Sequence, residues 1–160
     1  MKSRLAGSAI ALATVFAAAA SADDALSSAA NTTFLESNAH KPGVVSMPGI
    51  QYRVIKPGKG AQPDRSDCVS VYYKGSLING KVFDQTKPHE PATFPAGRLI
   101  AGWTEALLLM HEGDEWELVV PSGLAYGAKG AGNGLIPPNQ TLVFNIQLLK
   151  ASKSVMGQCS

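Results

Sequence analysis

One stretch near the middle of the chain, residues 99–110, constrains the fold more than any other. Its apolar residues recur at intervals of three and four, as on one face of an α-helix: Trp103, Ala106, Leu107 and Met110. Gly113 then provides a residue suited to a helix end. Strand-like runs flank the stretch, so we expect the apolar face to pack into the concave side of a sheet. Spacing alone leaves Trp103 with two interpretations, packed core residue or cavity floor.

The segments around this helix alternate polar and apolar residues and are bounded by Gly, Pro and Asn-Gly turns. They predict strands at residues 50–54, 68–74, 81–84, 92–94, 115–120 and 141–150. A loop over residues 122–140 carries five glycines, and so long a loop in a compact domain is usually functional. Separated strands with one helix on one face indicate an α+β fold with an antiparallel sheet.

Residues 1–22 have the pattern of a secretory signal peptide. Lys2 and Arg4 precede an apolar, Ala-rich run, and Ala20-Ser21-Ala22 fits the small-x-small cleavage pattern. The run is too short for a good membrane anchor, and no later segment is long and apolar enough to span a bilayer. The sequence therefore predicts an exported protein, periplasmic or secreted.

The rest of the chain divides into three parts. Residues 23–47 are polar and predict an N-terminal extension with a short helix over residues 33–39. A Met-Pro-Gly turn marks the expected boundary of a domain spanning residues 48–150, and residues 151–160 are expected to form a tail.

Charge argues against a nucleic-acid partner. The chain has 14 Lys and Arg against 12 Asp and Glu. Loss of Lys2 and Arg4 with the signal peptide makes these counts equal, so no basic field remains for nucleic acid or an anionic membrane.

The two cysteines, Cys68 and Cys159, are too few for a disulfide framework or a metal cluster. In an oxidising compartment they can pair with each other. Two alternatives stay open: a free Cys68 with Cys159 loose on the tail, or a Cys159-linked dimer.

Several familiar catalytic sites have no counterpart here. The three histidines are scattered, metal-ligand spacing is absent, and the Gly-rich residues 127–134 lack the Lys-Ser/Thr of a phosphate loop. We therefore expect no cofactor. Aromatic and aliphatic side chains remain, with one acid, Asp84, directly after Phe83. They suit an apolar cleft with a few polar groups.

Five motifs in one order resemble FKBP-type peptidyl-prolyl cis-trans isomerases: VYYKG at 71–75, GKVFD at 80–84, LIAGW at 99–103, LAYG at 124–127 and LIPPNQTLVF at 135–144. Residues 34–44 resemble the lead-in of the secreted macrophage-infectivity-potentiator subgroup. Members of that subgroup often carry an N-terminal helical dimerisation domain, and residues 23–47 are too few to hold one. The expectation is a monomer without that domain.

The resemblance implies an antiparallel half-barrel sheet wrapped around one short α-helix, with a pocket that receives a proline ring over the Trp103 indole. The residues expected to contact the substrate are Tyr73, Phe83, Phe94, Leu99, Ile100, Trp103, Leu135, Ile136 and Phe144. Asp84 and Tyr126 are the catalytic candidates. Each has a simpler interpretation, Asp84 as a turn cap or ion-pair partner and Tyr126 as a loop anchor.

The implied function is rotation of Xaa-Pro bonds in exported proteins through an apolar, desolvated pocket. The implied partners are proline-containing unfolded or partly folded proteins, and macrolides such as FK506 and rapamycin. Ala92 departs from the family, because many single-domain members have an aromatic wall there. The alternative is a chaperone or adaptor that binds proline-containing segments with little turnover.

Overall fold

The computed structural model describes residues 25–155 and 158–159, so the predicted signal peptide lies outside the described residues. The helices and strands are α2 (Ser28–Ala39), β1 (Val44–Ser46), β2 (Gln51–Lys56), β3 (Asp67–Leu77), β4 (Val82–Gln85), β5 (Ala92–Pro95), α3 (Ala101–Leu107), β6 (Glu115–Val120) and β7 (Leu142–Lys153). The strands form one antiparallel sheet in the order β1-β2-β6-β7-β3-β4, and β5 also pairs with β3. The predicted α+β fold is confirmed.

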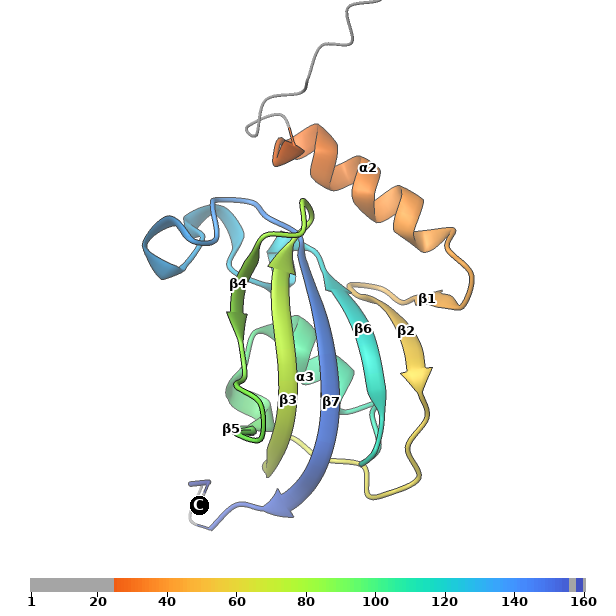
Figure 1. Cartoon of the computed structure of the whole chain (residues 1–160), viewed down its shortest axis with the longest axis vertical. Helices are drawn as coiled ribbons and strands as arrows, with labels where there is room; N and C mark the ends of the chain where they lie inside the picture. The colour runs from red at the N-terminus through yellow and green to blue at the C-terminus, as the bar shows by residue number, and fades with distance from the viewer. Residues whose placement is uncertain (1–24, 156–157, 160) are drawn as a thin grey trace, which may run out of the picture.

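Strands β3 and β7 form the centre of the sheet (Figure 1). Their pairing runs from Asp67 opposite Lys153 to Leu77 opposite Leu142, with one irregularity after Ser70. β7 therefore continues past residue 150, where the alternation of apolar residues stops and the strand was predicted to end. Residues 151–153 are strand rather than tail, because pairing with β3 extends the ladder without requiring burial.

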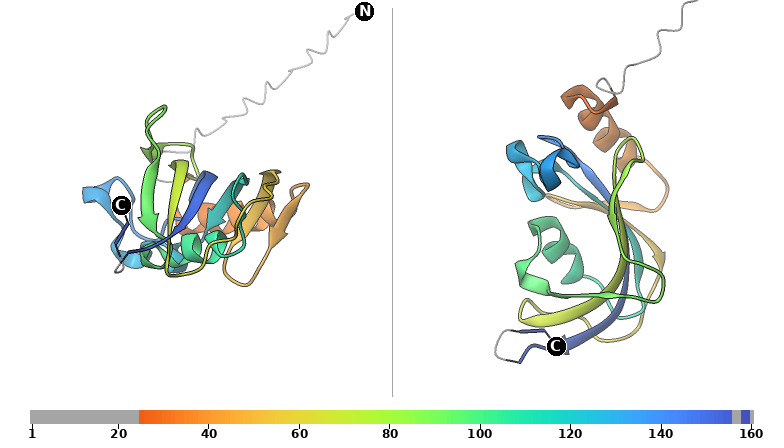
Figure 2. Two further views of the ribbon diagram at one scale, coloured as in Figure 1. Left: turned by 90° about the horizontal axis from the view of Figure 1, so that it is seen from below. Right: turned by 60° about the vertical axis from the view of Figure 1, so that its left-hand side comes forward.

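Helix α3 lies in the concave side of the curved sheet (Figure 2). Its predicted apolar face is confirmed, since four residues are at most 4% exposed: Trp103, Ala106, Leu107 and Met110. A Cβ at Gly102 would lie 2.4 Å from the Val120 side chain, so glycine lets the helix approach β6 closely. The helix is shorter than the predicted stretch at both ends: Ile100, just before it, has extended backbone angles, and the helix ends at Leu107, so Met110 is buried beyond its last turn.

The N-terminal extension is attached to the sheet. α2 begins at Ser28 rather than residue 33, because the Ser27 side chain accepts a hydrogen bond from Ala30 N and caps the helix. The sequence missed this turn because the buried residues of α2 are Asn31 and Asn38, so there is no apolar periodicity. The unpredicted strand β1 pairs with β2, and hydrogen bonds thus cross the boundary expected at residue 48.

Among the described residues, no helix has both the length and the apolar character needed to cross a membrane.

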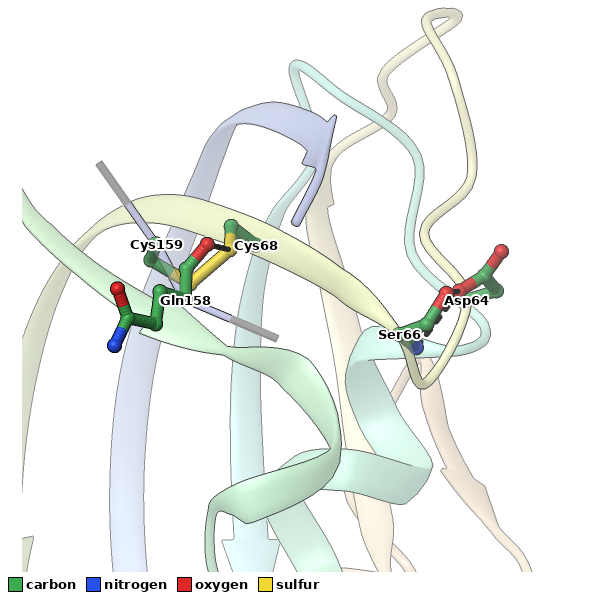
Figure 3. The surroundings of a disulfide bond; sticks show 5 residues. All are labelled: Asp64, Ser66, Cys68, Gln158 and Cys159. Carbon is green, nitrogen blue, oxygen red and sulfur yellow. Dashed lines mark hydrogen bonds between the residues drawn. A yellow bond between two sulfur atoms is a disulfide. The ribbon is translucent and has the colours of Figure 1, made fainter. Parts of the chain in front are cut away.

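The structure pairs Cys68 with Cys159, with 5.6 Å between their Cα atoms (Figure 3). Of the three alternatives, it therefore selects the intramolecular disulfide over a free Cys68 or a Cys159-linked dimer. The bond ties the chain's last residues to the buried start of β3. Lys153 Nζ lies 2.7 Å from Asp64 Oδ2 and 2.9 Å from Asp67 Oδ1. These two ion pairs also hold the end of β7.

We expect Cys159→Ser to lower the free energy of unfolding. The disulfide closes a loop with a sequence separation of 91 residues, for which the chain-entropy model gives about 4.6 kcal/mol. Urea unfolding of the oxidised protein and the variant would measure the difference. Reductant should remove it, and titration of two free thiols in the oxidised protein would contradict the pairing.

Candidate active site

A cavity of about 170 Å³ lies where the start of α3 meets strands β3, β4, β5 and β7. It is lined by nine residues: Tyr73, Phe83, Asp84, Phe94, Leu99, Ile100, Trp103, Tyr126 and Phe144. All nine are among the residues predicted for the site from the sequence. Folding thus brings residues that are up to 71 positions apart, Tyr73 and Phe144, into one cavity.

The Trp103 indole is enclosed by rings that stand perpendicular to it. Tyr73 and Phe144 lie with ring centroids 5.3 Å from the indole, at interplanar angles of 88° and 89°. Phe94 lies 6.3 Å away at 90°. Edge-to-face pairs of this kind are favourable. They make the indole the floor and the other rings the walls, so Trp103 is both core residue and cavity lining.

Phe83 and Phe144 meet edge to face over Gly75, with ring centroids 5.7 Å apart. A Cβ at Gly75 would lie 2.6 Å from Phe83 Cζ and 2.8 Å from Phe144 Cε1. The absence of a side chain at this position therefore allows both rings to reach the cavity. Gly75 belongs to the VYYKG motif, but nothing in the sequence indicated this packing role.

The polar wall of the cavity is a pair formed across β3 and β4. The Tyr73 hydroxyl donates a hydrogen bond to Asp84 Oδ2 at 2.5 Å. Burial, followed by this hydrogen bond and the charge of Asp84, raises the pKa of Tyr73 above its ordinary value. Tyr73 is thus the partner that orients the Asp84 carboxylate. Sequence reasoning missed this pairing because it depends on the register that sets Gly75 opposite Asp84.

Tyr126 lies at the rim of the cavity with 41% of its surface exposed. It comes from the long loop, where it precedes a short 3₁₀ helix, η3 (Gly127–Lys129). Gly127 has a φ of +54°, a conformation that side chains disfavour. The loop backbone, rather than deep burial, therefore places the Tyr126 phenol.

Leu135 and Ile136 do not line this cavity. They line a neighbouring hollow of about 330 Å³ that shares three residues with it, Phe83, Asp84 and Tyr126. Ile136 is 6% exposed and Leu135 50% exposed. The two residues predicted as substrate contacts thus flank the aromatic cavity. The loop sequence gave no sign of which hollow each would face.

The cavity offers apolar ring faces, one carboxylate and two phenol groups. Across the described part of the chain, no group of three or more His, Cys, Asp and Glu side chains is placed to hold a metal ion. Such a site can bind an apolar ring away from water and hold a polar backbone group beside it.

A family model described as FKBP-type peptidyl-prolyl cis-trans isomerase matches residues 59–149. Outer membrane protein MIP of Legionella longbeachae is 51% identical over 123 residues, 76% of this chain and 52% of that protein. The FKBP-type 22 kDa peptidyl-prolyl cis-trans isomerase of Escherichia coli K12 is 53% identical over 119 residues, 73% of this chain and 57% of that protein. The chain spans about half the length of these relatives.

Solved structures agree with this match. The crystal structure of a peptidyl-prolyl cis-trans isomerase from Pseudomonas syringae has a TM-score of 0.74 and 42% identity, and the match covers 84% of this chain and 98% of that one. The crystal structure of FkpA from Escherichia coli has a TM-score of 0.75 and 41% identity, with 79% of this chain and 60% of that chain covered.

We expect Gly75→Ala to displace Phe83 and Phe144 and to destabilise the fold by about 1–3 kcal/mol through overpacking. Near-ultraviolet circular dichroism would report the moved rings, and urea unfolding the stability. Gly123→Ala is the control, because a Cβ there meets nothing within 4 Å. Equal stability and spectra for the two variants would contradict the packing argument.

The raised pKa of Tyr73 predicts a loss of stability in alkali. Above the ordinary tyrosine pKa of about 10, the unfolded state releases a proton that folded Tyr73 retains. This contribution to stability is complete below that pH and falls as the pH rises toward the folded pKa. Urea unfolding at about pH 8 and about pH 10.5 would measure this loss. Between these two pH values, the free energy of unfolding should fall less for Tyr73→Phe than for the wild type. Tyr72→Phe, on the opposite face of β3, should decline as the wild type does.

Proposed function

This chain belongs to the family of FKBP-type peptidyl-prolyl cis-trans isomerases, and on that premise we propose that it accelerates rotation about Xaa-Pro bonds in exported proteins. The observation that carries the proposal is the indole floor of Trp103, walled by three perpendicular rings with the Asp84 carboxylate beside them. That cavity suits the flat, apolar ring of proline with its amide at the polar wall.

The chemistry needs neither a nucleophile nor proton transfer. Rotation of the amide faces a barrier of about 18–20 kcal/mol because twisting breaks its resonance. Without a catalyst, exchange takes on the order of tens to hundreds of seconds. The twisted amide has less charge separation than the planar one, so a dry cavity favours it. Catalysis is then tighter binding of the twisted form than of either planar form.

Six residues of the cavity have a role in this mechanism. The rings of Trp103, Phe94 and Phe144 bind proline and exclude water. Asp84, oriented by Tyr73, lies beside the carbonyl of the residue before proline and holds the twisted amide. The Tyr126 hydroxyl, at the exposed rim, donates a hydrogen bond to a substrate carbonyl.

The proposed partners are proline-containing unfolded or partly folded proteins outside the cytoplasm. Export is supported by the signal-like pattern of residues 1–22 and by the disulfide, which oxidising compartments allow. Macrolides such as FK506 and rapamycin are proposed to occupy the same cavity. Ala92, in β5, supplies no ring to hold them, so Phe94 is the β5 side chain that contacts the ligand.

The test is cis/trans exchange of a short Leu-Pro peptide, measured by NMR with residues 23–160. We expect rapid exchange with the wild type. Asp84→Ala should slow it more than tenfold, and Tyr126→Phe by about fivefold, the effect of one lost hydrogen bond of about 1 kcal/mol. Unchanged urea unfolding of both variants would exclude a general loss of structure.

Two other outcomes would change the proposal. Binding of the peptide without faster exchange would replace the isomerase with a chaperone that holds proline-containing segments. Full activity in both variants would leave the family activity but remove Asp84 and Tyr126 from the mechanism.

A further inference from the structure

Helix α2 and the long loop that carries Tyr126 lie at the same end of the molecule (Figures 1 and 2). α2 precedes residues 59–149, which the family model matches, so it is an addition to the matched domain. Its contacts with the loop were not predicted from the sequence. They join the N-terminal extension to the candidate active site.

The contact centres on one buried amide. Asn31 Oδ1 accepts a hydrogen bond from Thr141 N at 2.7 Å, and Asn31 Nδ2 donates to Gln140 Oε1 at 3.2 Å. These three residues are 6%, 2% and 5% exposed in the same order. Because water is excluded, each hydrogen bond lost here leaves a buried polar group without its partner.

Gln140 is in turn hydrogen-bonded to the base of the loop. Its Nε2 donates to Leu26 O and to Pro138 O, both at 3.0 Å. The next residue inward, Asn139, donates its backbone N–H to Gly127 O at 2.8 Å. Gly127 directly follows Tyr126, so a short series of hydrogen bonds connects α2 with the backbone at the rim of the cavity.

We propose that Asn31 is a positioning residue for this site: through Gln140 and Thr141 it holds the base of the loop and thereby the place of Tyr126. Tyr126 depends on such support because it is 41% exposed and has little burial of its own. The catalytic consequence rests on the proposed function, whereas the ordering of the loop does not.

The same helix offers a matched control. Asn38 is also a buried asparagine of α2, 2% exposed, but its Nδ2 donates to Gln51 Oε1 on β2 at 2.8 Å. Asn38→Ala therefore removes a buried hydrogen bond between the helix and the sheet and leaves the loop untouched. A residue that only fixes α2 to the domain would behave as Asn38 does.

The experiment compares Asn31→Ala and Asn38→Ala by isomerisation of a Leu-Pro peptide and by amide hydrogen exchange. We expect Asn31→Ala to lower kcat by up to about fivefold, the loss expected for Tyr126→Phe, with KM nearly unchanged, because a misplaced Tyr126 loses a contact made in the twisted state. Asn38→Ala should retain the wild-type kcat. The Asn139 amide should exchange faster in Asn31→Ala alone.

Equal kcat and equal Asn139 exchange in the two variants would overturn the inference. If Asn31→Ala does not fold, Asn31→Asp replaces it, since Asp keeps the acceptor for Thr141 N–H but loses the donor to Gln140. Faster Asn139 exchange than in Asn38→Ala supports the inference, and equal exchange overturns it. An inactive wild type would remove the proposed function, and Asn139 exchange would still decide whether Asn31 orders the loop.

Discussion

The packing of one short helix into a curved sheet is the interaction on which the rest of this structure depends. α3 turns Ala106 and Leu107 fully inward, Met110 just after it is equally buried, and Gly102 lets the helix backbone approach Val120 on β6. Trp103, at the first turn, extends beyond this close contact toward β3 and β5. The aromatic rings that surround it complete the core on one side and leave a cavity on the other. Core and site are therefore one packed structure.

This shared construction suits a reaction that needs an environment rather than a reactive group. Rings at right angles to the Trp103 indole form the walls of the cavity above it. The polar component is fixed, because Tyr73 donates to Asp84 across the β3–β4 pairing. In the proposed reaction, preorganisation of this kind lowers the cost of ordering the site around a twisted amide.

The domain is also supported from outside the segment that defines the family. At one end, α2 contacts the base of the loop through Asn31. At the other, the disulfide and the ion pairs of Lys153 hold β7 against the start of β3. The second contact lowers the pKa of Asp64 well below the usual range, because Lys153 and Ser66 donate hydrogen bonds to its carboxylate. Both supports use polar groups or sulfur, in contrast to the apolar core between them.

The sequence by itself determined what depends on local order. Periodicity placed the buried face of α3 and most strands, and ordered motifs identified the residues that line the cavity. The tertiary structure alone decided which residues meet across the sheet. Strand register paired Tyr73 with Asp84, and the loop's fold turned Leu135 and Ile136 into a second hollow. The same holds for α2, whose buried asparagines carry no apolar pattern, and for the choice among cysteine pairings. Each of these is a contact between segments far apart in the sequence. The periodicity of one segment shows which of its faces is buried but not which other segment packs against that face.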